Sequence, residues 1–180
     1  MHRDDQVGAG ERWIPQHEYD LILNRVPILC VDLIPLSADE PTKIGLIQRN
    51  TYAGGKGWCL IGGAVLRDEP LPAAVVRHLQ ATLGHRIDVD LDSLRLFAVV
   101  QYFTDPRLGR FHDPRKHAVS LTYTGRCIGE AKVQQNGEAR DFAWFNSGEV
   151  NKLFYGFGQG ELIASYVRSK DAEENLPRQF

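Results

Sequence analysis

The fold of this chain is decided by one stretch, Gly62-Gly-Ala-Val-Leu-Arg-Asp-Glu69-Pro-Leu-Pro-Ala-Ala-Val-Val-Arg77-His-Leu-Gln-Ala-Thr-Leu-Gly84. From Leu71 onward its apolar residues recur three and four positions apart, which predicts a helix with one apolar face toward a core. The two prolines are compatible with this helix because they fall in its first turn, which Asp68 or Glu69 can cap. We expect the Gly-Gly pair to end the preceding strand and Gly84 to end the helix.

Strands dominate on both sides of this helix. Residues 28–35 form an apolar run between two prolines, with Asp32 in its middle, and the run predicts a buried strand. The further elements expected along the chain are strands at 43–49, 58–61, 94–103, 118–126 and 139–145 and helices at 17–25, 147–154 and 159–169. Strands around one central helix and two C-terminal helices predict an α/β (α+β) fold, in which a mixed β-sheet is sandwiched between helices.

Length and composition fit a single globular domain. The chain has 180 residues, of which 43% are hydrophobic and 24% charged, and these ordinary values exclude a disordered or fibrous protein. We expect a flexible leader at 1–12, one domain at 13–170 and a charged tail at 171–180. The formal net charge of −2 provides no concentrated positive field, so neither nucleic acid nor a membrane is an expected partner.

The remaining composition points to the cytoplasm. No segment has the apolar length of a membrane span or the pattern of a secretory signal. Cys30, Cys59 and Cys127 are scattered and lack the spacing of a zinc site, so we expect them to be reduced and buried.

The stretch quoted above resembles the Nudix box, G-x5-E-x7-R-E-U-x-E-E-x-G-U, where U is a bulky aliphatic residue. The residues in register with the box are Gly63, Glu69, Arg77, Leu79 and Gly84. This resemblance to the Nudix hydrolase superfamily implies the Nudix fold. The box is degenerate, because His78, Ala81 and Thr82 replace the three glutamates of its helix. Those positions share one helical face, and in the family they hold divalent cations against a diphosphate through carboxylate oxygens.

One group within this superfamily also has an incomplete box, the bacterial GDP-mannose mannosyl hydrolases, which cut the sugar C1–O bond with inversion. The chain resembles them over residues 14–167. The matching residues are Asp32, Arg49, Arg77, Gln101-Tyr102-Phe103, His117 and the segment from Asp141 to Trp144. The resemblance implies that Asp32 and Arg49 bind a nucleotide sugar, that Arg77 contacts phosphate and that His117 is the general base. It also implies a homodimer.

The same resemblance implies a single Mg²⁺ ion, held partly by a box glutamate and a glycine carbonyl. The glutamate corresponds to Thr82, which leaves Gly62 and Glu69 as the candidate metal-binding residues. Glycosyl transfer to water can proceed with few metal ions, because arginine binds phosphate bidentately and the pKa of histidine, ~6.5, suits a base.

Each of these residues also has a plain structural interpretation. Asp32 needs a partner if it is buried, and Arg49 on the adjacent strand is the natural one. Arg77 can brace its own helix through Glu69, and that glutamate can simply be a helix cap. Tyr102 can be ordinary sheet packing or can stack on a nucleobase.

The histidines have plain interpretations as well. His117 follows a basic segment and can be a solvated surface residue, with His112 and His78 as competitors for its role. His78 can be a lone metal ligand or a plain replacement.

Three functions remain open at this point, all with a small-molecule nucleoside-diphosphate ligand. The first is hydrolysis of a nucleotide sugar or related derivative, with water attacking sugar C1. The second is a catalytically inactive Nudix-like domain that binds a nucleotide as a sensor. The third is diphosphate hydrolysis with metal ligands from elsewhere, such as Glu138 or Asp141.

Overall fold

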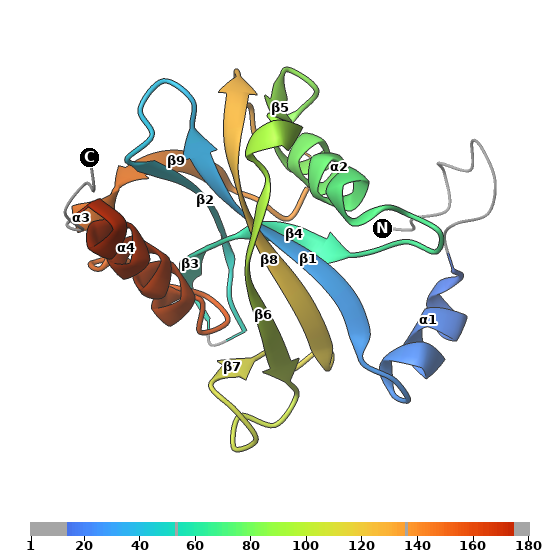
Figure 1. Ribbon diagram of the computed structural model, residues 1–180. Coiled ribbons are helices and arrows are strands. Elements are labelled where there is room, and N and C mark those ends of the chain that lie inside the picture. The colour runs from blue at the N-terminus through green and yellow to red at the C-terminus, as the bar shows by residue number, and fades with distance from the viewer. Residues whose placement is uncertain (1–13, 53, 136, 175–180) are drawn as a thin grey trace.

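A computed structural model describes residues 14–52, 54–135 and 137–174, and within them nine strands form one mixed sheet with helices on both sides (Figure 1). The helices are α1 (Gln16–Leu23), α2 (Leu71–Leu83), α3 (Ser147–Val150) and α4 (Gly160–Glu174), with a 3-10 turn at Leu91–Ser93. The strands are β1 (Ile28–Ser37), β2 (Lys43–Asn50), β3 (Lys56–Cys59), β4 (Ile61–Ala64), β5 (Ile87–Val89), β6 (Arg95–Phe103), β7 (Phe111–His112), β8 (Ala118–Gly129) and β9 (Asp141–Asn146). The predicted fold class is confirmed.

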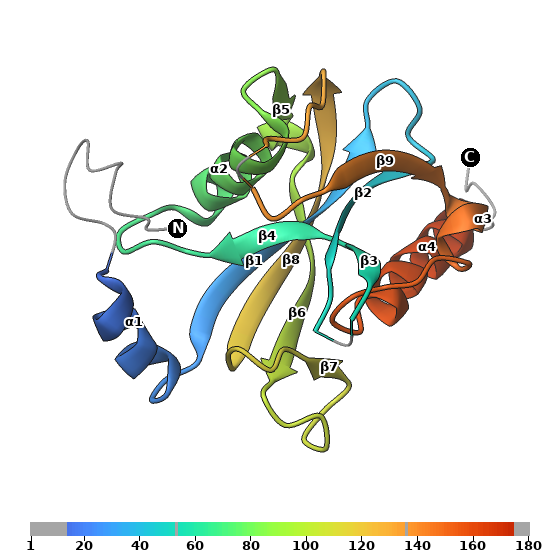
Figure 2. The same ribbon diagram turned by 180° about the vertical axis from the view of Figure 1, so that it is seen from behind.

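The sheet consists of two halves that meet at one end. β1 pairs in parallel with β8 along its whole length but meets β2 at the single register pair Leu36–Ile44. β2 pairs instead with β3 and β9, and these three strands form the second half-sheet, while β1, β4, β5, β6, β7 and β8 form the first (Figure 2). The chain crosses between the halves at Leu60, because β3 pairs with β2 and β4 pairs with β1.

Two apolar clusters cover the two faces of β1. Val31 and Leu33 belong to the cluster under α2, whereas Cys30 and Ile34 belong to the cluster under α4. This alternation follows from the two-residue period of a strand. The side chain of Asp32 therefore points to the α4 face.

The segment from Gly62 to Gly84 agrees only in part with the prediction from its sequence. The apolar stripe of α2 is buried and the helix ends at Gly84, whose φ of +84° is a conformation that favours glycine, as expected. The prediction that the Gly-Gly pair ends a strand is wrong, since β4 runs through both glycines to Ala64. The predicted cap at Asp68 or Glu69 is also wrong, because Pro70 is the N-cap and no side chain caps the helix.

Other boundaries differ modestly from the predictions. The helix predicted at 147–154 is only the four residues of α3, and α4 continues to Glu174, past the predicted domain end at 170. The short strands β5 and β7 lack any sequence prediction. The predicted leader at 1–12 and most of the predicted tail lie outside the described residues. In the described part of the chain, no helix has the length and apolar character needed to cross a membrane.

Candidate functional site

A buried carboxylate, Asp32, lies in the middle of β1, between Gly62 of β4 and Thr122 of β8. Only 9% of the residue is exposed, and its Oδ2 atom accepts hydrogen bonds from the Ser120 hydroxyl at 2.7 Å and the Tyr102 hydroxyl at 3.4 Å. Burial raises the pKa of this carboxyl, while the bond from Ser120, the charge of Lys116, the bond from Tyr102 and the charge of Arg49 lower it. The structure thus supplies the partners that a buried acid requires.

The network around Asp32 continues to the start of α4. Tyr102 accepts a hydrogen bond from the side-chain nitrogen of Gln159 at 2.9 Å, and the Gln159 oxygen accepts from the backbone nitrogen of Leu60 at 2.8 Å. Leu60 is the residue where the chain crosses between the half-sheets. The network therefore joins both half-sheets to α4 around one carboxylate.

Arg49 lies near Asp32 but does not bind it. Its ion pair is with Glu138, in the loop before β9, and its guanidinium lies 5.1 Å from the ring centre of Phe157. The expectation that Arg49 is the direct partner of Asp32 is therefore wrong, because the hydroxyl groups of the first half-sheet take that place. Arg49 affects Asp32 only through its charge.

A second arginine, Arg115, joins Arg49 at this site. The Nε atom and one terminal nitrogen of Arg115 donate to the two carboxylate oxygens of Asp113 at 3.0 and 2.9 Å, and another terminal nitrogen lies 3.8 Å from Glu138. The Arg115 guanidinium also lies 4.9 Å from the ring centre of Tyr52. Nothing in the sequence pattern singled out Arg115, Tyr52 or Phe157, since they come from three separate loops.

Arg77 forms hydrogen bonds to other residues of the box segment. Its Nε and one terminal nitrogen donate to Glu69 at 2.6 and 2.7 Å, and that same terminal nitrogen donates to the Ala64 carbonyl at 3.0 Å. The hydrogen bonds from Arg77 lower the pKa of the Glu69 carboxyl, against a partial burial that raises it. The helix-bracing interpretation of this pair is confirmed.

The box positions provide a poor set of ligands for a divalent cation. Both Glu69 oxygens accept protein hydrogen bonds, one of them also from the Leu66 backbone at 2.9 Å. His78 Nε2 lies 3.0 Å from the Ala64 carbonyl oxygen, which can only accept, so this nitrogen carries a proton. No group of three His, Cys, Asp or Glu side chains that could hold a metal occurs among the described residues. These residues do not fit Mg²⁺ as a resident cofactor.

His117 lies on a different face of the sheet from Asp32. Its Nε2 atom is 2.7 Å from the Gln101 amide nitrogen and its ring stacks on Phe103. Gln101 and Phe103 alternate along β6 with Tyr102, which faces Asp32. The structure thus brings Asp32 and Tyr102 together, places Arg49 nearby, and sets His117 and the Arg77–Glu69 pair apart from them.

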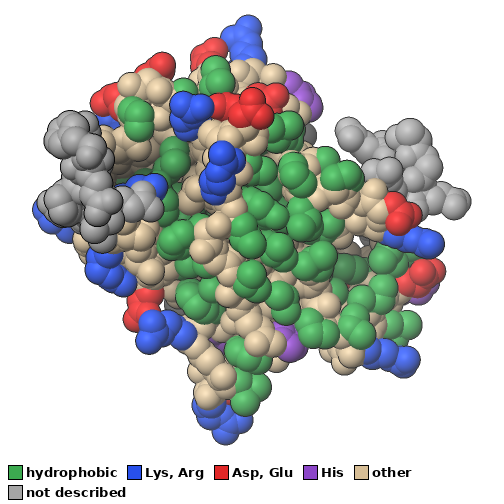
Figure 3. Space-filling model, viewed as in Figure 1, with side chains coloured by type: hydrophobic (Ala, Val, Ile, Leu, Met, Phe, Trp, Pro, Cys, Tyr) green, Lys and Arg blue, Asp and Glu red, His purple; other side chains and the backbone are tan. Residues whose placement is uncertain are grey.

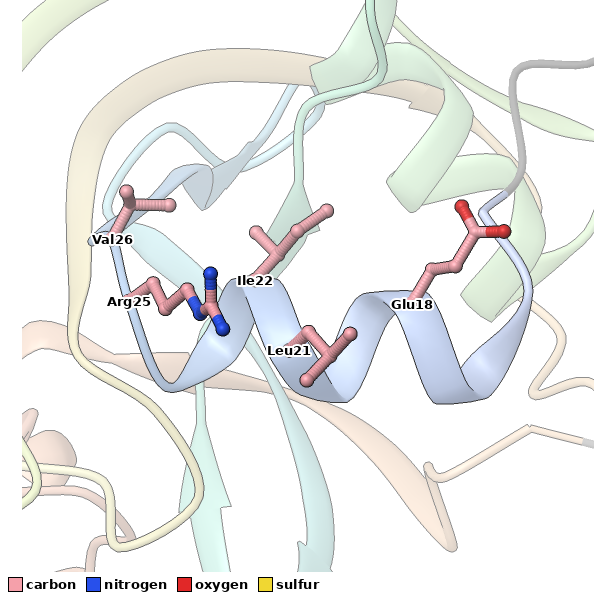
Figure 4. A pocket seen from close by; sticks show the side chains of 5 residues that line it. All are labelled: Glu18, Leu21, Ile22, Arg25 and Val26. Atoms are coloured by element: carbon pink, nitrogen blue, oxygen red, sulfur yellow. The ribbon is translucent and has the colours of Figure 1, made fainter.

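A separate depression lies along α1, lined by Glu18, Leu21, Ile22, Arg25 and Val26 (Figure 4). All five residues come from α1 and the turn that follows it, and none of them takes part in the networks described above. We therefore place the candidate site at the residues around Asp32 and the two arginines.

Comparison with solved structures places this fold among the Nudix proteins. A Jonesia denitrificans protein, described as a possible asymmetric diadenosine tetraphosphate hydrolase, is 28% identical over 86% of this chain and 99% of its own, with a TM-score of 0.69. A MutT Nudix hydrolase from Burkholderia pseudomallei is 25% identical over 69% of this chain and 86% of its own, with a TM-score of 0.54.

A third structure has a bound ligand. The Nudix domain of NrtR from Shewanella oneidensis, complexed with ADP ribose, is 22% identical over 91% of this chain and 100% of its own, with a TM-score of 0.59. No curated protein matches the chain. The family model that describes a domain of unknown function, DUF4916, matches residues 9–160. The chain therefore belongs to the DUF4916 family, and its fold is that of the Nudix hydrolases.

Proposed function

We propose that this protein is a Nudix-fold hydrolase of a nucleoside-diphosphate derivative, with a nucleotide sugar as the substrate class. The observation that carries the hydrolase part of the proposal is the 28% identity, over 86% of this chain, to the protein described as a possible diadenosine tetraphosphate hydrolase. The nucleotide-sugar class rests on Asp32, Arg49 and His117, which match the GDP-mannose mannosyl hydrolases. The arginines beside Asp32 support it, because a planar guanidinium neutralises a diphosphate without losing its own charge.

In this proposal the leaving group is the nucleoside diphosphate and the attacking group is water. Arg49 neutralises the charge that develops on the phosphate oxygens, and Asp32 and Tyr102 position the sugar. Arg77, whose hydrogen bonds go to Glu69 and Ala64, is a separate candidate phosphate contact through its remaining terminal nitrogen. His117, whose Nε2 atom lies 2.7 Å from the Gln101 amide nitrogen, is the candidate general base. Because His117 lies on the opposite face of the sheet from Asp32, His117 can act as the base only for a sugar bound away from Asp32. The base role of His117 and the sugar-positioning role of Asp32 are therefore alternative hypotheses.

The deciding experiment is hydrolysis in oxygen-18 water. We would offer GDP-mannose, ADP-ribose and diadenosine tetraphosphate to the purified protein, with and without Mg²⁺, and weigh the products by mass spectrometry. Label in the sugar indicates attack at carbon, and label in a phosphate indicates attack at phosphorus. Release of no product from any of the three compounds would overturn the proposal.

His117 has its own test within this reaction. His117→Gln should lower kcat at least about 100-fold if the histidine is the base, because general bases contribute factors of this size. His112→Gln, in the short strand β7, is the matched control and should leave kcat unchanged. Equal rates in the wild type and His117→Gln would remove the base assignment.

A second function, nucleotide binding without turnover, is favoured by one observation, the absence of carboxylates at positions 78, 81 and 82. A binding domain should be stabilised against heat by ADP-ribose that remains intact over hours. Stabilisation followed by disappearance of the ligand would instead identify a hydrolase.

Diphosphate hydrolysis with Glu138 and Asp141 as metal ligands fits the geometry less well than the two functions above. Both oxygens of Glu138 face arginines, and one oxygen of Asp141 accepts a hydrogen bond from the Phe142 backbone at 2.8 Å. That mechanism requires loss of activity in both Glu138→Gln and Asp141→Asn. Unchanged turnover in the two variants would exclude it.

A further inference from the structure

We propose that Arg49 and Arg115 form a phosphate-binding subsite whose ligand position is held, in the free protein, by the carboxylate of Glu138. The inference rests on the proposed function, since it names the residues that receive the phosphate groups of a nucleoside-diphosphate derivative. It adds Arg115 and Glu138, to which neither the Nudix box nor the comparisons give a binding role.

The two guanidinium groups are held in place by aromatic rings. Arg49 and Arg115 lie 5.1 and 5.4 Å from the ring centre of Phe157, and Arg115 also lies over Tyr52. The Tyr52 and Phe157 rings meet edge to face, with centres 5.7 Å apart. Packing against these faces holds each guanidinium at low entropic cost, so that little order must be gained when an anion binds.

Phe157 itself has an unusual backbone conformation. Its φ of +59° lies in the left-handed region that large side chains rarely adopt, and Gly158 follows with a φ of +75°. Such strain persists only where the surroundings fix it and is concentrated at functional sites. Here it brings the ring under both arginines.

The hydrogen bonds leave one side of each arginine for a further anion. The carboxylate of Asp113, a residue that is 5% exposed, accepts hydrogen bonds from the Nε atom and one terminal nitrogen of Arg115. The other terminal nitrogen faces Glu138 at 3.8 Å, too far for a hydrogen bond. In the described part of the chain, the polar partner of Arg49 is Glu138 as well. One carboxylate therefore stands opposite two guanidinium groups.

The charges favour replacement of this carboxylate by a phosphate. The two arginines and the two acids, Asp113 and Glu138, cancel, so withdrawal of Glu138 leaves one positive charge for a ligand. The Glu138 side chain is 59% exposed, whereas that of Arg49 is 16% exposed, so water screens the ion pair from the Glu138 side and weakens it. A diphosphate carries more negative charge and more acceptor oxygens than one carboxylate, and both matter for a bidentate arginine site.

The loop that carries Glu138 also contacts the box helix. The backbone nitrogens of Lys132 and Gln134 donate to the carbonyls of Leu83 and Thr82 at 2.9 and 3.0 Å. Departure of Glu138 from the arginines therefore involves a loop that is anchored at the end of α2.

The test measures the affinity of ADP, inorganic pyrophosphate and adenosine by calorimetry in three variants. Glu138→Gln should bind ADP and pyrophosphate about threefold more tightly than the wild type, since it removes a competing charge. Arg115→Met should bind both at least about tenfold more weakly, and Arg115→Lys should lie between. The affinity of adenosine, which has no phosphate, should be the same in all of them.

Glu130→Gln is the matched control, because Glu130 belongs to the same loop and forms an exposed pair with Arg86. Its affinities should equal those of the wild type. Circular dichroism confirms that each variant is folded. Unchanged ADP affinity in Glu138→Gln, or an equal increase in Glu130→Gln, would overturn the subsite.

Turnover is measured separately, so that the two proposals fail separately. Changed affinities without hydrolysis would retain the subsite and remove the hydrolase. Hydrolysis with unchanged affinities in Glu138→Gln and Arg115→Lys would retain the hydrolase and remove the subsite.

Discussion

Asp32 is a single acid on an apolar sheet face, and its titration should control stability. Because burial raises its pKa, the folded protein binds this proton more tightly than the unfolded chain. The unfolding free energy should therefore decrease as pH rises from about 3.9, the unfolded value, to the folded pKa. Above the folded pKa the carboxyl is charged in the folded protein, and the buried charge lowers the unfolding free energy by its full amount.

Asp32→Asn tests this linkage, because it keeps the shape and an acceptor oxygen but removes the charge. The stability of the variant relative to the wild type should increase with pH across this window, measured by urea unfolding between pH 3.5 and 8. Asp88→Asn, at an exposed strand position, should show no such trend. A difference between Asp32→Asn and the wild type that is independent of pH would contradict the linkage.

The titration of Glu69 should change the unfolding free energy with pH in the opposite direction. Its pKa is lowered, chiefly by the hydrogen bonds from Arg77, so its contribution is present above the unfolded value of about 4.3 and is lost as pH falls through the folded pKa. Glu69→Gln should destabilise the protein by about 1–3 kcal/mol at pH 7. This difference should shrink below about pH 4.3. Urea unfolding at pH 7 and pH 3 measures both effects, with Glu161→Gln, an exposed acid paired with Arg110, as the control.

At the scale of elements, β4 depends on the absence of a side chain at Gly62. A Cβ atom there would collide with the Val31 carbonyl and with Asp32, because β4 and β1 pair at this point. Gly62→Ala should therefore cost about 1–3 kcal/mol, as overpacking does. Gly148→Ala, where nothing lies within 4 Å of the added atom, should be nearly neutral in the same thermal unfolding experiment. Similar losses in both variants would contradict this account.

Helices and strands were predictable from the sequence where a pattern of apolar residues lies within one continuous segment. The stripe of α2 and the apolar run of β1 each indicated the correct element from neighbouring residues alone. The pair Gly62-Gly63 was misread because glycines are typical of turns, whereas here Gly62 allows the close approach of β1 and Gly63 allows that of the His78 ring on α2.

The candidate site was predictable only in part for the same reason. Asp32 stood out as an acid within an apolar strand, and Arg49 stood out through the resemblance to the mannosyl hydrolases, but the partners of both residues were not visible. Ser120, Gln159 and Glu138 come from other parts of the chain and meet them only after the sheet has formed.

At the scale of the whole molecule, one face of the first half-sheet is apolar and open. Hydrophobic side chains gather there, as Figure 3 shows, over the strands between α1 and α2. Leu29, Leu96 and Val99 are 46%, 52% and 61% exposed. Exposed apolar patches on a folded protein are typical of association surfaces, and two copies of one patch are complementary by twofold symmetry.

We therefore expect a homodimer through this face. The wild type should sediment as a dimer at micromolar concentration, and Val99→Lys should sediment as a monomer, because it buries a charge in the interface. Leu108→Lys replaces an equally exposed aliphatic side chain in a loop and should leave the dimer intact. Sedimentation of the wild type as a monomer would contradict the expected homodimer.

The junction between the half-sheets determines how the two halves can move relative to each other. Because β1 and β2 share the single register pair Leu36–Ile44, the angle between the halves is fixed by side-chain packing more than by a hydrogen-bond ladder. Substitutions in that packing can widen or narrow the space between the halves while every strand keeps its partner. Because Asp32 lies on β1 and Arg49 on β2, such substitutions change the separation of these two site residues without changing the fold.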